Sequence, residues 1–255
     1  MRIPLAVLVV SLLLTPSVFA QDGGADVKAV LAKPIERLQT SDIRASGHLV
    51  RVDASGVRTS YPISMKVHWF PGVLRILSEV GSGNARVHIL LEMHPNGRNS
   101  IQIAHFGDKA PAVLPVEKWA DGPLGPGFSY EDFFESQYYW PAQSVRPGTK
   151  FGARDCDLLK SKPGASDHTD YSEIQTWLDH SIGYPVYVEK TIKATGAVKQ
   201  FTYFGLRKNE GVWSASQVEG KIRGQAGSTL LIIDRGSARA NLALKDFAPE
   251  QLTRF

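Results

Sequence analysis

The chain of 255 residues contains a single cysteine, Cys156. One thiol cannot form an intramolecular disulfide, so the fold must be stable through its core alone. No basic cluster next to Cys156 favours its thiolate, and we expect a small, apolar and buried side chain rather than a nucleophile. A disulfide-stabilised scaffold is therefore excluded, and thiol chemistry has little support.

Motifs for catalysis and for metal binding are also missing. The sequence has no Gly-x-Ser-x-Gly elbow and no His-x-x-x-His pair on a helical stretch. His88 is expected on a solvated strand face and His94 in a turn, and only His105 shares the apolar parity of its strand. His168 falls in a polar loop. We therefore expect no enzyme, no metal site and no cofactor.

A strong charge of one sign is absent as well. The formal net charge is +4, and basic residues are interleaved with acidic ones along the whole chain. Such scattering lacks the clustered basic footprint of a nucleic-acid-binding protein. A weak attraction to anionic membrane surfaces stays open, with an ordinary solvated surface as the simpler interpretation.

The chain begins with Arg2, an apolar run from Ile3 to Leu14, a break at Pro16 and the small residue Ala20. This order is typical of a secretory signal peptide over residues 1–20. The apolar run is shorter than the about 20 residues of a membrane span, so a retained anchor helix is the weaker alternative. We expect cleavage near Ala20 and one exported, soluble domain over residues 21–255.

Periodic patterns cover most of the remaining sequence. Apolar residues at three- and four-residue spacing predict an amphipathic helix over residues 25–39, interrupted at Pro34. Alternation with period two then predicts antiparallel strands with one apolar and one solvated face. The expected strands cover residues 61–69, 73–80, 86–93, 101–103, 151–159, 171–178, 184–192, 199–206, 211–222 and 229–240, and an extended tail follows at 247–249.

The segment over residues 107–147 is rich in proline, glycine and aromatic residues, and we expect short helices there that cover the sheet. Within its stretch GPGFSYEDFF, Ser129 and Asp132 have the spacing of a helix-capping box. Phe128 and Phe133 have the spacing of a hydrophobic staple. Glu131 and Asp132 share one helical turn and cannot flank a substrate bond from opposite sides, so the stretch predicts a helix start rather than an acid–base pair.

An antiparallel sheet with one apolar face and helices against it either packs solidly or encloses a hollow for a ligand. The sequence alone leaves both outcomes open. The residues expected to line such a hollow are Tyr61, Ile63, Met65, Val67, Trp69, Leu74, Ile76, Ile89, Leu91, Ile101, Ile103, Phe133 and Phe134.

The second half of the chain resembles the LolA-like family of outer-membrane lipoprotein-sorting proteins. The features that carry the resemblance are GPGFSYEDFF, the strand DCDLL, the stretch from Tyr171 to Phe204, and the closing LKDFAPEQLTRF with its Phe-x-Pro pattern. Within the long stretch, Trp177-Leu-Asp179, Pro185 and Thr195-to-Lys199 stand where the family has a strand end, a proline and a hairpin. Thr195-Gly-Ala replaces the usual acidic hairpin residues.

The resemblance implies a mainly β, α+β fold: one large antiparallel sheet curved into an unclosed half-barrel, with helices over its concave apolar face. It also implies a periplasmic, non-enzymatic carrier of lipid or lipoprotein acyl chains, a membrane-associated protein partner and no nucleic acid. We expect a monomer, and we expect Phe128, Ser129, Glu131 and Asp132 to cap a helix that gates the hollow. The alternatives are an envelope regulatory or scaffold module that binds a protein, and, third, an enzyme acting on lipid or cell-wall material.

Overall fold

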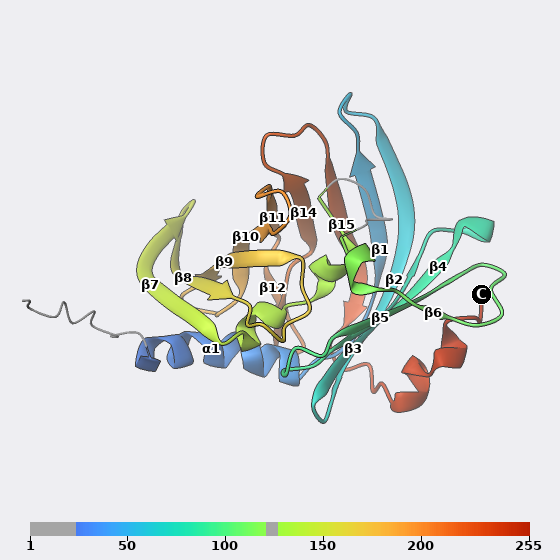
Figure 1. Cartoon of the computed structure of the whole chain (residues 1–255), viewed down its shortest axis with the longest axis horizontal. Coiled ribbons are helices and arrows are strands. Elements are labelled where there is room, and N and C mark those ends of the chain that lie inside the picture. The colour runs from blue at the N-terminus through green and yellow to red at the C-terminus, as the bar shows by residue number, and fades with distance from the viewer. Residues whose placement is uncertain (1–23, 121–126) are drawn as a thin grey trace, which may run out of the picture.

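The computed structural model describes residues 24–120 and 127–255 (Figure 1). The predicted signal peptide and the first residues of GPGFSYEDFF lie outside these ranges. The helix α1 spans Gly24–Gln39 and runs through Pro34 without a break, so the predicted interruption is wrong. Pro34 and its neighbours Leu31 and Leu38 are buried, and this packing outweighs the cost of the missing proline N–H.

Thirteen strands form one antiparallel sheet that does not close into a barrel, which confirms the predicted fold class (Figure 1). Their order across the sheet is β6-β5-β4-β3-β2-β1-β15-β14-β11-β10-β9-β8-β7. The strands are β1 (Asp42–Val52), β2 (Arg58–Phe70), β3 (Val73–Val80), β4 (Val87–Met93), β5 (Ser100–His105), β6 (Ala112–Val113), β7 (Ala142–Phe151), β8 (Arg154–Lys162), β9 (Tyr171–Asp179), β10 (Pro185–Ile192), β11 (Val198–Phe204), β14 (Gln217–Ile222) and β15 (Ser228–Ser237). A separate two-stranded hairpin joins β12 (Arg207–Asn209) to β13 (Val212–Ser214).

Three strand predictions need correction. The sequence patterns give no strand over Asp42–Val52, where β1 lies. The segment expected to be helical up to residue 147 is already a strand from Ala142, β7, and a turn at Gly152 separates it from β8, which covers most of the strand expected at 151–159. The strand expected at 211–222 is likewise divided into β13 and β14, with the chain changing sheets between them.

The concave face of the sheet holds the main core. Side chains of α1, of strands from both halves of the sheet, and of residues 114–120 and 127–140 meet there. The last two stretches form the 3-10 turns η2 (Val116–Lys118), η3 (Tyr130–Phe133) and η4 (Ser136–Tyr139), of which η3 and η4 lie inside the curve of the sheet (Figure 1). The core therefore reaches both halves of the sheet through these aromatic-rich stretches.

A second, smaller core lies on the other face of β4 and β5. The tail predicted to be extended instead forms two 3-10 turns, η5 (Leu244–Phe247) and η6 (Pro249–Gln251). The tail side chains Phe247 and Leu252 pack against Leu90 and Ala104 of the sheet. The strands at this end of the molecule are thus covered on both faces.

Candidate functional site

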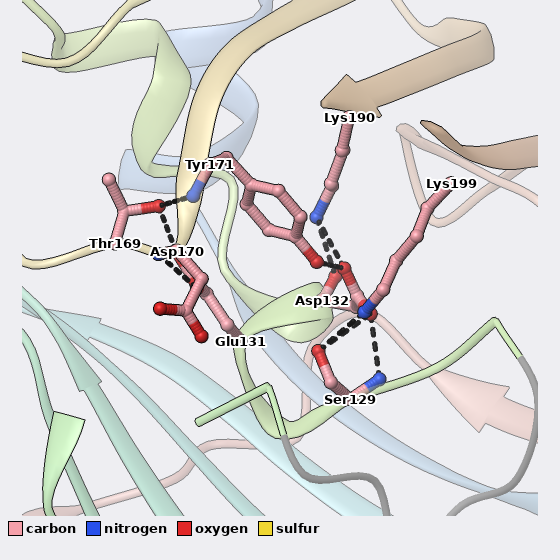
Figure 2. A network of polar contacts seen from close by, with 8 residues as sticks. All are labelled: Ser129, Glu131, Asp132, Thr169, Asp170, Tyr171, Lys190 and Lys199. Atoms are coloured by element: carbon pink, nitrogen blue, oxygen red, sulfur yellow. Dashed lines mark hydrogen bonds and ion pairs between the residues drawn. The ribbon is translucent and has the colours of Figure 1, made fainter. Parts of the chain in front are cut away.

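Two lysines face each other on the concave side of the sheet. Lys190 of β10 and Lys199 of β11 are direct cross-strand partners, an unfavourable pairing for like charges. The carboxylate of Asp132, carried by η3, lies between them. Its Oδ1 is 3.2 Å from Lys190 Nζ, and its Oδ2 is 2.8 Å from Lys199 Nζ (Figure 2). The Tyr171 hydroxyl of β9 donates to Oδ1 at 2.5 Å.

The Asp132 side chain is fully buried, and both lysine side chains are nearly so. Burial would raise the pKa of Asp132, but the charges of Lys199 and Lys190, together with their hydrogen bonds, lower it to about 2. The carboxylate is therefore ionised at any physiological pH. It neutralises part of a positive charge that the sheet would otherwise hold in its interior.

The same carboxylate forms the acidic half of the predicted capping box. The backbone N–H of Ser129 donates to Asp132 Oδ2 at 2.7 Å, and the Ser129 hydroxyl donates to that oxygen at 2.9 Å. The predicted staple is also confirmed, with the rings of Phe128 and Phe133 centred 5.9 Å apart. Phe128 then packs edge-on against Phe201 of β11. The cap and the staple fasten η3 to the sheet.

Glu131 faces away from the lysine pair and is 3% exposed. The Thr169 hydroxyl donates to its Oε1, and the backbone N–H of Asp170 donates to its Oε2 at 3.0 Å (Figure 2). Burial raises the pKa of Glu131 to about 7, against the opposing effect of these hydrogen bonds and of Lys190. Both carboxylates are engaged by protein donors, so the geometry anchors a segment rather than presenting an acid and a base to a substrate.

The raised pKa of Glu131 gives a pH dependence with a definite sign. An acid whose pKa is higher in the folded state favours folding below its unfolded pKa of 4.5, and this contribution is lost as the pH rises toward 7. We expect the free energy of unfolding to fall by roughly 2–3 kcal/mol over this window. The E131Q variant should lack this decline in urea titrations. An equal decline in both proteins would contradict the assignment; Asp132 titrates at lower pH and does not interfere.

An apolar cavity of about 200 Å³ opens on the concave face where the two halves of the sheet meet. Met65 and Val67 of β2 line one side, and Val218, Leu231 and Ile233 of β14 and β15 line the other. The first half of the chain and its last strand thus build one hollow together. Aliphatic side chains of this kind suit a hydrocarbon ligand.

The β12–β13 hairpin borders this cavity through Arg207, Asn209 and Val212. Its strand β13 is half-buried, and its hydrogen bonds to β15 are exposed. Asn209 Nδ2 donates to the carbonyl of Gly236 at 3.4 Å, and the carboxylate of Glu210 accepts from the Ser237 hydroxyl at 3.0 Å. The hairpin is therefore held more weakly than η3.

Comparisons with known proteins show which family and which solved structures this chain resembles. A family model described as "-like: Uncharacterized protein" matches residues 120–254, more than half of the chain. The chain belongs to that family. A structure described as an outer membrane lipoprotein-sorting protein domain from Vibrio parahaemolyticus has a TM-score of 0.78 at 18% identity, covering 89% of this chain and 100% of its own.

Two further structures agree. A DUF1329 family protein from Desulfovibrio piger ATCC 29098 has a TM-score of 0.79 at 14% identity. A LolA superfamily protein from Nitrosomonas europaea has a TM-score of 0.64 at 12% identity. Each match covers 89% of this chain and 99% of the other. No curated protein sequence matches the chain. The fold is LolA-like, as the sequence resemblance indicates.

Within the LolA-like fold, the residues predicted to line a hollow have unequal positions. Most belong to the packed core: Ile63, Leu74, Ile76, Ile89, Leu91, Ile101 and Phe134 are buried in it, and Trp69, Ile103 and Phe133 pack against it. Only Met65 and Val67 of the predicted set also line the apolar cavity, and Tyr61 is 38% exposed. The predicted set lacks the cavity residues Val218, Leu231 and Ile233, because only the distant pairing of β15 with β1 brings them to this cavity.

The environments of two histidines in this LolA-like fold differ from those that the sequence pattern predicts. His88 is buried rather than solvated, because the C-terminal tail covers its strand face; its Nδ1 lies 2.9 Å from the carbonyl oxygen of Leu252. His105 is exposed although it has the apolar parity. Over residues 24–120 and 127–255, no three His, Cys, Asp or Glu side chains gather to hold a metal ion. Cys156 is buried, as predicted.

Proposed function

We propose that this protein is a non-enzymatic, periplasmic carrier of lipid or lipoprotein acyl chains, which acts with a membrane-associated partner protein. The observation that supports the proposal is the apolar cavity on the concave face of a LolA-like half-barrel. Burial of apolar surface would drive binding, at about 25 cal/mol per Å² removed from water. Among the described residues, no helix has the length and hydrophobicity needed to cross a membrane.

The cavity volume sets a condition on this function. At about 200 Å³, the cavity is smaller than the roughly 300–1,000 Å³ of ordinary ligand pockets, so a long acyl chain needs further opening. Moving η3 would separate Asp132 from two buried lysines, at a cost of several kcal/mol. Lifting the β12–β13 hairpin breaks exposed hydrogen bonds, each of which is worth about 1 kcal/mol, and uncovers the half-buried side chains of Val212 and Trp213, but it leaves no buried charge unpaired. We therefore propose that the hairpin opens first and that the gate formed by Phe128, Ser129, Glu131 and Asp132 moves less.

A bulky side chain in the cavity should block uptake. Each buried methylene contributes about 0.8 kcal/mol, so losing the space for two or more should weaken a fluorescent acyl probe by about tenfold or more. We expect this loss for V67W and for V218W, which fill the cavity from opposite sides. The measurement is probe titration of the purified protein, together with native mass spectrometry for retained lipid.

The matched control is V57W, because Val57 is 60% exposed and lies outside the cavity lining. This variant should bind the probe like the wild type. Equal binding by all three variants, or a wild-type protein that carries no lipid and takes up no probe, would rule out the proposed carrier.

A second candidate function follows because the protein's own side chains fill most of the concave face. Because residues 114–120 and 127–140 already occupy much of it, the protein could serve as an envelope regulatory or scaffold module that binds another protein. A pull-down from envelope extract that recovers one stoichiometric protein and no lipid would favour this function over the carrier.

A further inference from the structure

The outer face of the central strands carries a basic cluster that the concave site does not use. On β1, the buried residues Ala45 and Leu49 point to the concave side. Side chains alternate along a strand, so Arg44 and Ser46 project from the opposite, convex side. This places a separate set of side chains behind the apolar cavity, on β1, β2 and β15.

The register arranges this set as two short rows across three strands. Ser46 pairs with Ser64 on β2 and with Arg235 on β15. Arg44 pairs with Lys66 on β2 and with Ser237 on β15. Neighbouring strands lie about 4.8 Å apart, so each row spans only about 10 Å. The hydroxyl of Ser237 donates to Glu210 of the β12–β13 hairpin, and the other five residues, which we call the convex basic cluster, line a hollow of about 440 Å³.

The charges of the cluster are only partly compensated. The Asp246 carboxylate of the tail lies 3.7 Å from Lys66 Nζ, and the positive charge of Arg44 also stabilises it. Neither Arg44 nor Arg235 forms an ion pair with any residue that the structure describes. The nearby Asp234 carboxylate lies 2.8 Å from Nδ1 of His48. Arg44 and Lys66 are direct cross-strand partners, an unfavourable arrangement that the single Asp246 carboxylate compensates only in part.

We propose that the convex basic cluster binds a phosphoryl group. Two guanidinium groups offer the forked donors that suit phosphate oxygens, Lys66 adds a point charge, and the hydroxyls of Ser46 and Ser64 supply neutral donors between them. The group can belong to a lipid headgroup or to a free phosphate compound. A carrier bound in this way would keep its apolar cavity, on the opposite face, free for cargo.

Calorimetric titration with inorganic phosphate at low salt tests this site. The wild type should bind saturably, and the double variant R44Q/R235Q should bind at least tenfold more weakly. The control R51Q/R58Q removes the same total charge outside the cluster and should bind like the wild type. No saturable binding to phosphate or to vesicles, or equal weakening in both double variants, would overturn the proposal.

Vesicles distinguish the two sources of the group. Sedimentation with phosphatidylglycerol vesicles, compared with phosphatidylcholine vesicles, should show binding that R44Q/R235Q loses and R51Q/R58Q keeps, if the ligand is an anionic lipid headgroup. Binding of inorganic phosphate without selective vesicle binding assigns a free phosphate compound instead. The acyl probe should bind all these proteins equally, so this test is independent of the proposed carrier function.

Discussion

Replacing Asp132 with alanine is expected to lower the free energy of unfolding by about 3–5 kcal/mol, the usual cost of leaving a buried charge without its partner. Lys190 and Lys199 would both lose the carboxylate that they contact at 3.2 and 2.8 Å. Both side chains are almost completely buried, so water cannot replace the carboxylate without opening the core. Urea unfolding at neutral pH measures the effect.

Two comparisons isolate the buried charge. D155A removes an acidic partner of Lys150 at 3.4 Å on the surface and should cost less than about 1 kcal/mol. The triple variant D132L/K190M/K199M removes all three charges and should recover much of the loss, because apolar side chains often replace a buried ion network well. A D132A variant no less stable than D155A would contradict this role of the network.

Gly127→Ala should have the next largest effect. Gly127 has a φ of +88°, which disfavours an L-residue by roughly 1–2 kcal/mol. An added Cβ would also lie 2.4 Å from the backbone carbonyl of Gly220 on β14. Overpacking of this kind costs a further 1–3 kcal/mol or so, and we expect a total loss of about 2–5 kcal/mol. Because Gly127 leads into the Phe128 staple, the variant should also loosen η3.

Gly56 provides the matched control for this prediction. It has nearly the same φ, +87°, but an added Cβ would meet nothing within 4 Å. G56A therefore reports the backbone cost alone, and the difference between the two variants in urea unfolding reports the contact with Gly220. If G127A and G56A lose equal stability, the close approach of η3 to β14 does not constrain the segment.

Local chemistry made part of the candidate site predictable. The cap between Ser129 and Asp132 and the staple between Phe128 and Phe133 follow from the spacing of residues within one turn, and both are present. The strand β3 has the predicted bounds because its alternation is uninterrupted. By contrast, β1 contains Gly47, whose close approach to the Ile232 carbonyl leaves no room for a side chain and breaks the apolar pattern.

The features that the sequence does not predict depend on contacts between distant parts of the chain. The burial of His88 depends on a tail more than 160 residues away, which no local pattern indicates. The alternation of the two strands does indicate that the lysine pair faces inward. Lys190 has the inward parity of Val186 and Val188, and Lys199 has the inward parity of Phe201. A lysine at an inward position predicts a buried acidic partner. Its identity as Asp132 still requires the fold.

The pairing of β1 with β15 affects the order in which the parts of the sheet fold. This contact joins Arg44 to Ser237, so its loop closure spans most of the chain, whereas β1 to β5 pair with their sequence neighbours. Non-local pairing of this kind forms slowly. The two halves can assemble as separate meanders before the last strand joins them. The apolar cavity, with walls from both halves, then exists only after this final step, so a chain whose synthesis or export is interrupted before β15 has no cavity to fill.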